Sequence, residues 1–230
     1  MIRFENVHKS FGNQKVLDGV SFDVMEGEIL AVVGPSGTGK SVLLKHIVGL
    51  LEPDEGSVVV KEGAQIGYLF QSGALLAWLT VRENVALPLK ETTRLPEQEI
   101  DKFVDDALDA VGLKESADKY PAEISGGMVK RAGLARAIVR KIDVVLYDEP
   151  TSGLDSVTSR NIHRLIREVN TRRRLTSIVV THDLSGAFSL ADRILMLKNG
   201  KVVLLATPEE FLQSDIPEVQ DLVSARKGEI

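Results

Sequence analysis

The sequence predicts an α/β fold whose core is a mostly parallel β-sheet. Three apolar, largely β-branched segments carry this prediction, and they read ILAVV at 29–33, VVLYDEP at 144–150 and TSIVVTH at 176–182. Such runs are typical of strands that are buried on both faces of a parallel sheet. Segments in which the apolar residues have helical spacing lie between and after them.

The first of these segments is followed by a predicted helix that starts after Ser41. Its apolar residues fall at spacings of three and four and form one face; they are Leu43, Leu44, Ile47, Leu50 and Leu51. Before it, apolar and polar residues alternate from residue 2 to residue 24, which predicts an N-terminal antiparallel β subdomain. The alternating apolar residues are Ile2, Phe4, Val7, Val20, Phe22 and Val24.

Residues 72–141 differ from the rest of the chain. Their apolar residues have helical spacing and no convincing strand is present, so this stretch is interpreted as a helical subdomain inserted into the core. Near the end, Asn199 and Gly200 stand between two apolar segments, which predicts a type I′ hairpin. TPEE at 207–210 then predicts a capped helix start. We expect residues 1–230 to form a single domain that contains this insertion.

Length, composition and charge exclude several classes of protein. The 230 residues are 43% hydrophobic and 27% charged, which is typical of a globular protein that folds and stays soluble. The formal net charge of −5 argues against a surface that coats nucleic acid. There is no cysteine and hence no disulfide framework, and the apolar runs are too short to cross a bilayer.

A glycine-rich segment, GPSGTGKS at 34–41, lies between the strand at 29–33 and the predicted helix. It matches the phosphate-binding loop in full and has the strand–loop–helix context that this pattern requires. The loop would gather backbone N–H groups around ATP phosphates, with Lys40 reaching the β- and γ-phosphates and Ser41 ligating Mg²⁺. The alternative is a glycine-rich turn that opens an ordinary helix. The predicted nucleotide-binding residues are Gly34, Pro35, Ser36, Gly37, Thr38, Gly39, Lys40, Ser41 and Val42.

Polar residues follow the other predicted strands at their carboxyl ends, where parallel sheets gather their ligands. Asp148 is placed to hold the Mg²⁺, and Glu149 to polarise the attacking water. His182 would contact the γ-phosphate or that water. Gln71 would reach the metal or the water, and Phe11 would stack on a nucleobase. The alternatives are a solvated loop edge for the acidic pair, a structural role for His182, an ordinary surface position for Gln71 and a core-filling role for Phe11.

The segment PAEISGGMVKR at 121–131 places two glycines at the start of a basic helix. The N-terminus of a helix attracts anions, but the phosphate loop already binds the nucleotide of its own chain. A second such site has a use if it binds the nucleotide held by another molecule, so the sequence predicts a homodimer. Ser125, Gly126 and Gly127 would then meet the γ-phosphate across the interface, and Met128 and Asp155 belong to the same predicted nucleotide-binding set. The alternative is that these residues merely begin an amphipathic helix; the helix is expected in either case, but it does not explain the paired glycines. Its core face would be Met128, Ala132, Ala135 and Val139, and its solvated face Lys130, Arg131, Arg136 and Arg140.

Taken together, these segments resemble the ATP-binding-cassette ATPases over essentially the whole chain. The six landmarks of that family occur in order: GPSGTGKS, Gln71, ISGGM, VVLYDEP, SGLD at 152–155 and His182. The resemblance implies a P-loop, RecA-like core and a head-to-tail dimer, with Glu149 as general base, Asp155 at the dimer seam and Phe11 under the adenine. Met128 departs from the family, which mostly has glutamine there, and hydrolysis is expected to survive this loss of a polar contact.

Met128 and three further segments are similar to the Mla/Mce-type ATPases of bacterial phospholipid transport: SGALL at 72–76, LTVRENVALPLKE at 79–91 and SDIPEVQDLV at 214–223. This resemblance implies a peripheral subunit on the cytoplasmic face of the inner membrane. It would bind an integral-membrane permease, for which Leu75 to Leu79 with Trp78 is the candidate contact, besides a periplasmic lipid-binding partner and a small cytosolic one. The alternatives are an amino-acid or lipoprotein transporter and, less favoured, an ATP-driven clamp on nucleic acid. Single-cassette length and negative charge argue against nucleic acid as a partner.

Overall fold

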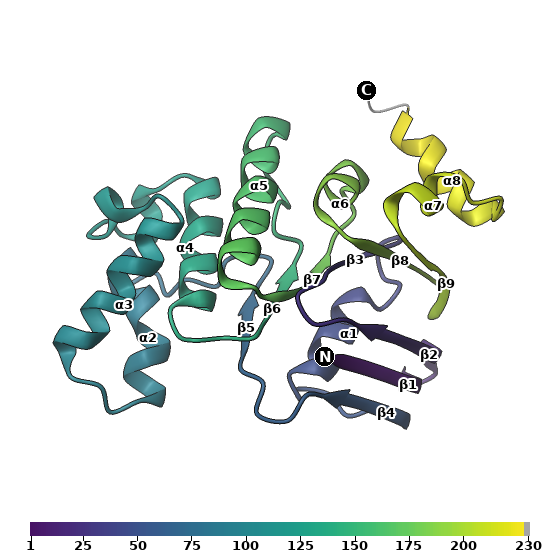
Figure 1. The fold of residues 1–230 in the computed structure, drawn as a ribbon, viewed down its shortest axis with the longest axis horizontal. Coiled ribbons are helices and arrows are strands. Elements are labelled where there is room, and N and C mark those ends of the chain that lie inside the picture. Colours follow the sequence, from purple (N-terminus) through teal and green to yellow (C-terminus); the bar gives the residue numbers. More distant parts are fainter. Residues whose placement is uncertain (228–230) are drawn as a thin grey trace.

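Two β-sheets form the body of the molecule in the computed structural model, which describes the backbone of residues 1–227 and the side chains of residues 1–224 (Figure 1). The three-stranded antiparallel sheet has the order β2-β1-β4, and the six-stranded sheet has the order β5-β6-β7-β3-β8-β9. The strands of the smaller sheet are β1 (Ile2–Phe11), β2 (Gln14–Val24) and β4 (Glu55–Val60). Those of the larger sheet are β3 (Ile29–Val33), β5 (Ile66–Leu69), β6 (Val144–Asp148), β7 (Thr176–Val180), β8 (Arg193–Lys198) and β9 (Lys201–Ala206).

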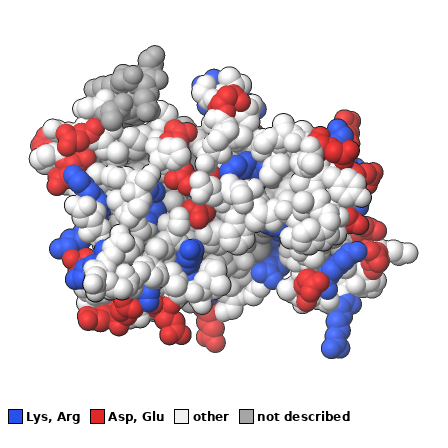
Figure 2. Space-filling view, turned by 180° about the vertical axis from the view of Figure 1, so that it is seen from behind, with Lys and Arg blue, Asp and Glu red and all other residues white. Residues whose placement is uncertain are grey.

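The helices cover both faces of the larger sheet and extend beyond its β5 end. Those attached to the sheet are α1 (Lys40–Ile47), α5 (Ser156–Arg173), α6 (Leu184–Leu190), α7 (Pro208–Leu212) and α8 (Pro217–Lys227). Between residues 72 and 141 the elements are α2 (Val81–Thr92), α3 (Glu97–Ala110), α4 (Gly126–Ile138) and the 3₁₀ turns η1 (Lys114–Ser116) and η2 (Pro121–Glu123). This helical group forms one end of the molecule in Figure 1, and Figure 2 shows the opposite face, on which acidic and basic side chains are interspersed.

The predicted α/β class, the mostly parallel sheet and the N-terminal antiparallel sheet are confirmed. Strands β5, β6, β7, β3 and β8 run parallel to one another, and only β9 pairs antiparallel, with β8. The β8–β9 hairpin turns at Asn199 (φ 51°) and Gly200 (φ 74°), as the type I′ prediction requires. Thr207 caps α7, and its Oγ accepts a hydrogen bond from the Glu210 N–H.

Both faces of the parallel strands are buried, which explains why their sequences are apolar without alternation. In β6, Val144 and Leu146 pack with α1 and the antiparallel sheet, whereas Val145 and Tyr147 pack with the helical group. Successive side chains of a strand point to opposite faces, so a buried sheet needs apolar residues at every position. Helix α1 lies between the two sheets, and its apolar face faces this first core.

The predicted extent of α1 is wrong. The helix ends at Ile47, and Gly49 follows with φ 70°, a left-handed conformation that ends helices. Leu50 therefore leaves the apolar face and is 66% exposed. The helical spacing of Leu50 and Leu51 continued beyond the helix by chance, and glycine was the stronger signal.

Candidate functional site

The phosphate loop, residues 34–41, leads from the carboxyl end of β3 into α1. Gly34 (φ 146°), Gly37 (φ 78°) and Gly39 (φ 96°) adopt backbone conformations that favour glycine. Space also demands glycine at two of them: an added Cβ would lie 2.1 Å from the Leu197 carbonyl oxygen at Gly34 and 2.9 Å from Val16 Cγ1 at Gly39. The loop is therefore curled against β8 and β2, and the N-terminus of α1 points into it.

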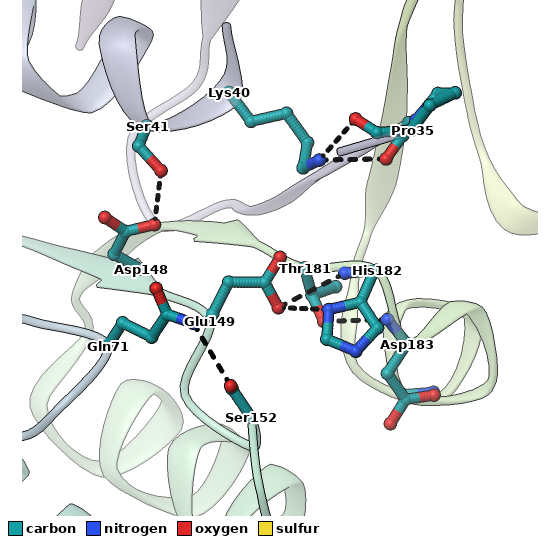
Figure 3. Close-up of polar contacts among 12 residues, drawn as sticks. Pro35, Lys40, Ser41, Gln71, Asp148, Glu149, Ser152, Thr181, His182 and Asp183 are labelled. Carbon is teal, nitrogen blue, oxygen red and sulfur yellow. Dashed lines mark hydrogen bonds and ion pairs between the residues drawn. The ribbon is translucent and has the colours of Figure 1, made fainter. Parts of the chain in front are cut away.

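Lys40 is buried at the start of α1, with 7% of its surface exposed. Its Nζ donates hydrogen bonds to the carbonyl oxygens of Gly34 (2.8 Å) and Pro35 (2.9 Å), as Figure 3 shows. Burial lowers the pKa of Lys40, and the carboxylates of Glu149 and Asp148 act in the opposite direction. The loop thus encloses a cation at its centre, which suits an anionic ligand.

Ser41 and Asp148 bring two oxygen donors together beside the loop. The Ser41 hydroxyl donates to Asp148 Oδ1 at 2.7 Å, and Tyr68 donates to Asp148 Oδ2 at 3.2 Å. Hydroxyl and carboxylate oxygens are the ligands that Mg²⁺ prefers, so this pair fits the ion. The Gln71 side chain instead donates to Ser152 Oγ at 3.2 Å. Its predicted role as a metal ligand stays a prediction.

Glu149 and His182 contact each other across neighbouring strands. Glu149 directly follows β6, His182 follows β7, and the two strands pair in parallel. Glu149 Oε2 lies 2.6 Å from His182 Nδ1 and accepts a longer bond, 3.4 Å, from the His182 backbone N–H (Figure 3). Glu149 has φ 50°, a left-handed conformation that costs about 1–2 kcal/mol for a non-glycine residue. Strain of this kind is found where a side chain must point in one direction.

Most of the predicted site residues border one cavity of about 490 Å³; Gly34, Pro35, Thr38 and Asp148 are not part of its lining. It extends from the phosphate loop to the exposed ring of Phe11. Its predicted site residues are Phe11, Ser36, Gly37, Gly39, Lys40, Ser41, Val42, Gln71, Glu149 and His182. The structure thus brings together residues that lie up to 171 positions apart. Phe11 ends β1 of the antiparallel sheet, and the other residues follow β3, β5, β6 and β7 at the carboxyl edge of the larger sheet.

The serine–diglycine turn consists of Ser125, Gly126 and Gly127. Its Ser125 and Gly127 border a different cavity, of about 650 Å³, between the helical group and α5. Ser125 caps α4, and its Oγ accepts a hydrogen bond from the Met128 N–H at 3.3 Å. Asp155 caps α5 in the same way, accepting bonds from Val157 and Thr158. Hydrogen bonds from Thr158 hold the pKa of the Asp155 carboxyl below its ordinary value. In one chain, therefore, the two candidate anion-binding elements face different cavities.

The two glycines of this turn have different surroundings. Gly126 is exposed, and an added Cβ would lie 3.5 Å from Leu154 Cδ2, an ordinary contact. Gly127 is buried, and its Cβ would lie 2.7 Å from Thr158 Cγ2. The close approach of α4 to α5 thus accounts for Gly127 within one chain, which the sequence argument did not anticipate. Gly126 remains without such a packing reason.

The predicted solvated face of α4 is wrong. Lys130 is buried with 6% of its surface exposed, and the arginines of this face donate to backbone carbonyls of neighbouring segments. Arg136 donates hydrogen bonds to the Gly73 and Ala74 carbonyls. Arg131 donates to the Val111 and Gly112 carbonyls, and Arg140 donates to the Ile66 carbonyl. Helical spacing places a residue on a face but does not reveal which neighbouring carbonyls lie beside that face. Similarly, Arg173, in the last turn of α5, donates to the Ile138 carbonyl at 2.6 Å.

A phosphate loop after a buried strand, an oxygen pair for Mg²⁺ and a carboxylate across the cavity define the class of nucleotide-hydrolysing proteins with this loop. The family model described as ABC transporter matches residues 17–152. The chain belongs to the ABC transporter family, and it is an ATPase. None of the helices in residues 1–227 has the length and apolar character needed to cross a membrane.

The relatives cover nearly the whole chain. The probable ribonucleotide transport ATP-binding protein mkl of Mycobacterium leprae is 40% identical over 98% of this chain and 69% of its own length. The intermembrane phospholipid transport system ATP-binding protein MlaF of Haemophilus influenzae is 39% identical over 100% of this chain and 93% of its own. The dimeric post-hydrolysis structure of the ATP-binding cassette MJ0796, bound to ADP and Pi, superimposes with a TM-score of 0.82, at 33% identity over 90% of this chain and 99% of that one.

Proposed function

We propose that this ABC transporter ATPase works as a homodimer that sandwiches ATP between the phosphate loop of one protomer and the serine–diglycine turn of the other. The observation that carries the proposal is the separation of these two elements, which border different cavities of one chain. Gly126 is exposed, so its backbone N–H is available to a partner's nucleotide. The MJ0796 cassette, similar in fold, is described as dimeric with ADP and Pi.

Within this dimer each residue of the site has a role that follows from its geometry. When ATP binds, the Lys40 ammonium exchanges its hydrogen bonds to the loop carbonyls for hydrogen bonds to the phosphates, because charged acceptors bind it more strongly than neutral ones. Glu149 accepts a proton from the attacking water, with His182 holding its carboxylate in place. Ser41 and Asp148 would hold Mg²⁺, which when bound neutralises phosphate charge. Phe11, exposed at the rim of the cavity, stacks on the adenine.

Glu149→Gln tests this mechanism. The amide keeps the shape of the side chain but does not accept the proton, so turnover is expected to fall by about 10²–10⁴-fold with ATP still bound. The trapped nucleotide then holds two protomers together. In size-exclusion chromatography with ATP and Mg²⁺, the fraction of the variant that elutes as a dimer is expected to exceed that of the wild type. A Glu149→Gln protein that stays monomeric with ATP and turns it over at the wild-type rate contradicts the proposal.

We further propose that the cargo is phospholipid and that the subunit sits on the cytoplasmic face of a bacterial inner membrane. The similarity to MlaF over the full chain supports this cargo. Relatives at similar identity are described as transporting ribonucleotide, sulfate or thiosulfate, and bicarbonate, so the cargo needs a direct test. Purifying the complex from membranes and identifying its lipids by mass spectrometry provides one. An amino-acid or lipoprotein transporter remains the alternative.

The segment Leu75 to Leu79 is proposed as the contact with an integral-membrane permease. Trp78, the single tryptophan of the chain, is 72% exposed. Ala74, the residue before this segment, lines a largely apolar groove of about 370 Å³ between the sheet and α2, together with Phe70, Leu87 and Pro88. Trp78→Asp is expected to leave ATP turnover of the isolated subunit unchanged and to reduce its recovery with membranes, as measured by co-purification. Unchanged recovery and transport would exclude this contact. Periplasmic lipid-binding and small cytosolic partners are part of the same proposal.

A further inference from the structure

Lys130 is a buried cation on α4 that contacts the backbone of two site residues. Its Nζ donates to the carbonyl oxygens of Gln71, in a short contact, and of Glu149, at 3.4 Å. Gln71 follows β5 and Glu149 follows β6, and these strands are parallel neighbours. One side chain of the helical group thus joins two adjacent strand ends at the nucleotide cavity.

Burial of this ammonium is unfavourable. Desolvation lowers the pKa of Lys130, and the carboxylates of Glu149 and Asp148 act in the opposite direction. Methionine has nearly the same length and would fill the space without desolvating a charge. Packing therefore does not explain a lysine at this position, whereas the two carbonyls that it holds do.

Glu149 is the residue whose backbone needs such support. Its left-handed conformation (φ 50°) determines where its carboxylate points, which is toward His182 Nδ1 at 2.6 Å. The backbone around it is held by bonds from the Glu149 N–H to the Val180 carbonyl and from the Ser152 N–H to the Glu149 carbonyl. Lys130 is a second donor to the Glu149 carbonyl and approaches it from the helical group.

Helix α4 and the chain that follows β5 are packed too closely to move independently. An added Cβ at Gly133 of α4 would lie 2.7 Å from Leu69 Cδ1 and 3.1 Å from the Gly73 carbonyl oxygen. Arg136 donates to the Gly73 and Ala74 carbonyls, at 2.9 and 2.6 Å. Lys130 extends this tightly packed unit to Glu149.

We propose that Lys130 is a positioning residue for ATP hydrolysis. Its ammonium ties the Gln71 and Glu149 carbonyls to α4 and so keeps the Glu149 carboxylate in its place beside His182. Since Ser125 caps the same helix, the contact also links the serine–diglycine turn to the residue that takes the proton. This inference rests on the proposed function, in which Glu149 is the general base, and Lys130 itself does not touch the nucleotide.

Steady-state ATP turnover of Lys130→Met tests the inference. The variant keeps the volume and removes both hydrogen bonds, so kcat is expected to fall at least about tenfold while KM for ATP stays within about threefold, because the phosphate loop is untouched. Arg173→Met is the matched control: Arg173 also donates to a carbonyl, that of Ile138 in α4, but outside the nucleotide cavity. It is expected to keep the wild-type kcat. Lys130→Arg retains a charged donor and is expected to recover kcat to within about threefold of wild type.

A double-mutant cycle with Glu149→Gln separates positioning from general destabilisation. If Lys130 acts through Glu149, Lys130→Met lowers the residual turnover of Glu149→Gln by less than about twofold. An equal loss in both backgrounds, or a Lys130→Met kcat equal to wild type, overturns the inference. Lys40→Ala and Glu149→Gln report on the proposed function by themselves. If both retain full turnover, the assignment of the site is wrong, whatever Lys130→Met shows.

Discussion

Alanine substitutions at Gly126 and Gly127 separate the function of the serine–diglycine turn from its packing. An added methyl at the exposed Gly126 meets Leu154 at an ordinary 3.5 Å, whereas at the buried Gly127 it meets Thr158 Cγ2 at 2.7 Å. Thr158 has little freedom to withdraw, because its Oγ donates to Asp155 Oδ2 at 2.6 Å. The two variants add the same atom one residue apart, so each is the control for the other.

The expected change in stability follows from these distances. Carbon atoms in contact are ordinarily about 3.5 Å apart, so Gly127→Ala requires α4 or Thr158 to move by roughly 0.8 Å. Overpacking of this kind costs about 1–3 kcal/mol, and the better helix propensity of alanine offsets about 0.5–1 kcal/mol. A net loss of about 1 kcal/mol lowers Tm by about 2–4 °C in a chain of this length. Gly126→Ala lacks the clash, so its Tm is expected to equal or exceed that of wild type.

Activity is expected to follow a different order. In the proposed dimer the Gly126 methyl lies where the partner's γ-phosphate approaches, so Gly126→Ala loses ATP turnover by at least about tenfold despite its unchanged Tm. Phosphate release measures turnover, and differential scanning calorimetry measures Tm. The reasoning is refuted if Gly126→Ala retains wild-type turnover, or if it lowers Tm as much as Gly127→Ala does.

Three other perturbations address the loop and the core. Lys40→Ala removes the buried cation and is expected to abolish ATP turnover, measured by phosphate release, without lowering Tm; retained turnover would contradict its role. Gly186→Ala places a Cβ 2.0 Å from Cε1 of the buried His163 ring. Overpacking of about 1–3 kcal/mol is expected to lower Tm by about 2–12 °C in calorimetry, and a smaller change would show that the ring withdraws freely. Burial lowers the pKa of His163, and the Asp183 carboxylate raises it by a smaller amount. Near this pKa the unfolded chain therefore binds more protons than the folded one. The free energy of unfolding, from urea titrations, is therefore expected to decrease as pH falls from about 7 through the unfolded pKa near 6.5, and His163→Gln to weaken this dependence.

The strand ends illustrate how far sequence patterns reach. Asp148, Glu149 and His182 were identified because each follows an apolar β-branched run, and parallel strands place their carboxyl ends at one edge. The local rule and the sheet topology agree there, and the three residues lie at one edge of the sheet as expected, while their roles in hydrolysis stay predictions. The phosphate loop was also identified from a local rule. Gly37 and Gly39 adopt positive φ values within their own turn, and glycine is the residue that adopts such values most readily.

Contacts between segments that are distant in the sequence could not be predicted from local patterns. Nothing in GGMVKR distinguishes Lys130, which is buried against Gln71 and Glu149, from Arg131, which reaches the Val111 and Gly112 carbonyls. Both are long cations on a helix, and which one enters the core depends on where the neighbouring carbonyls lie.

The amino-acid sequence by itself determined the fold class, the phosphate loop and the acidic strand end, because periodicity, glycine conformation and short-range capping act within a few residues. Only the tertiary structure decided that Gly127 packs against Thr158, that Lys130 is buried at the site, and that the loop and the serine–diglycine turn border separate cavities. The physical reason is that burial and steric fit depend on the distances between segments, which no local pattern records.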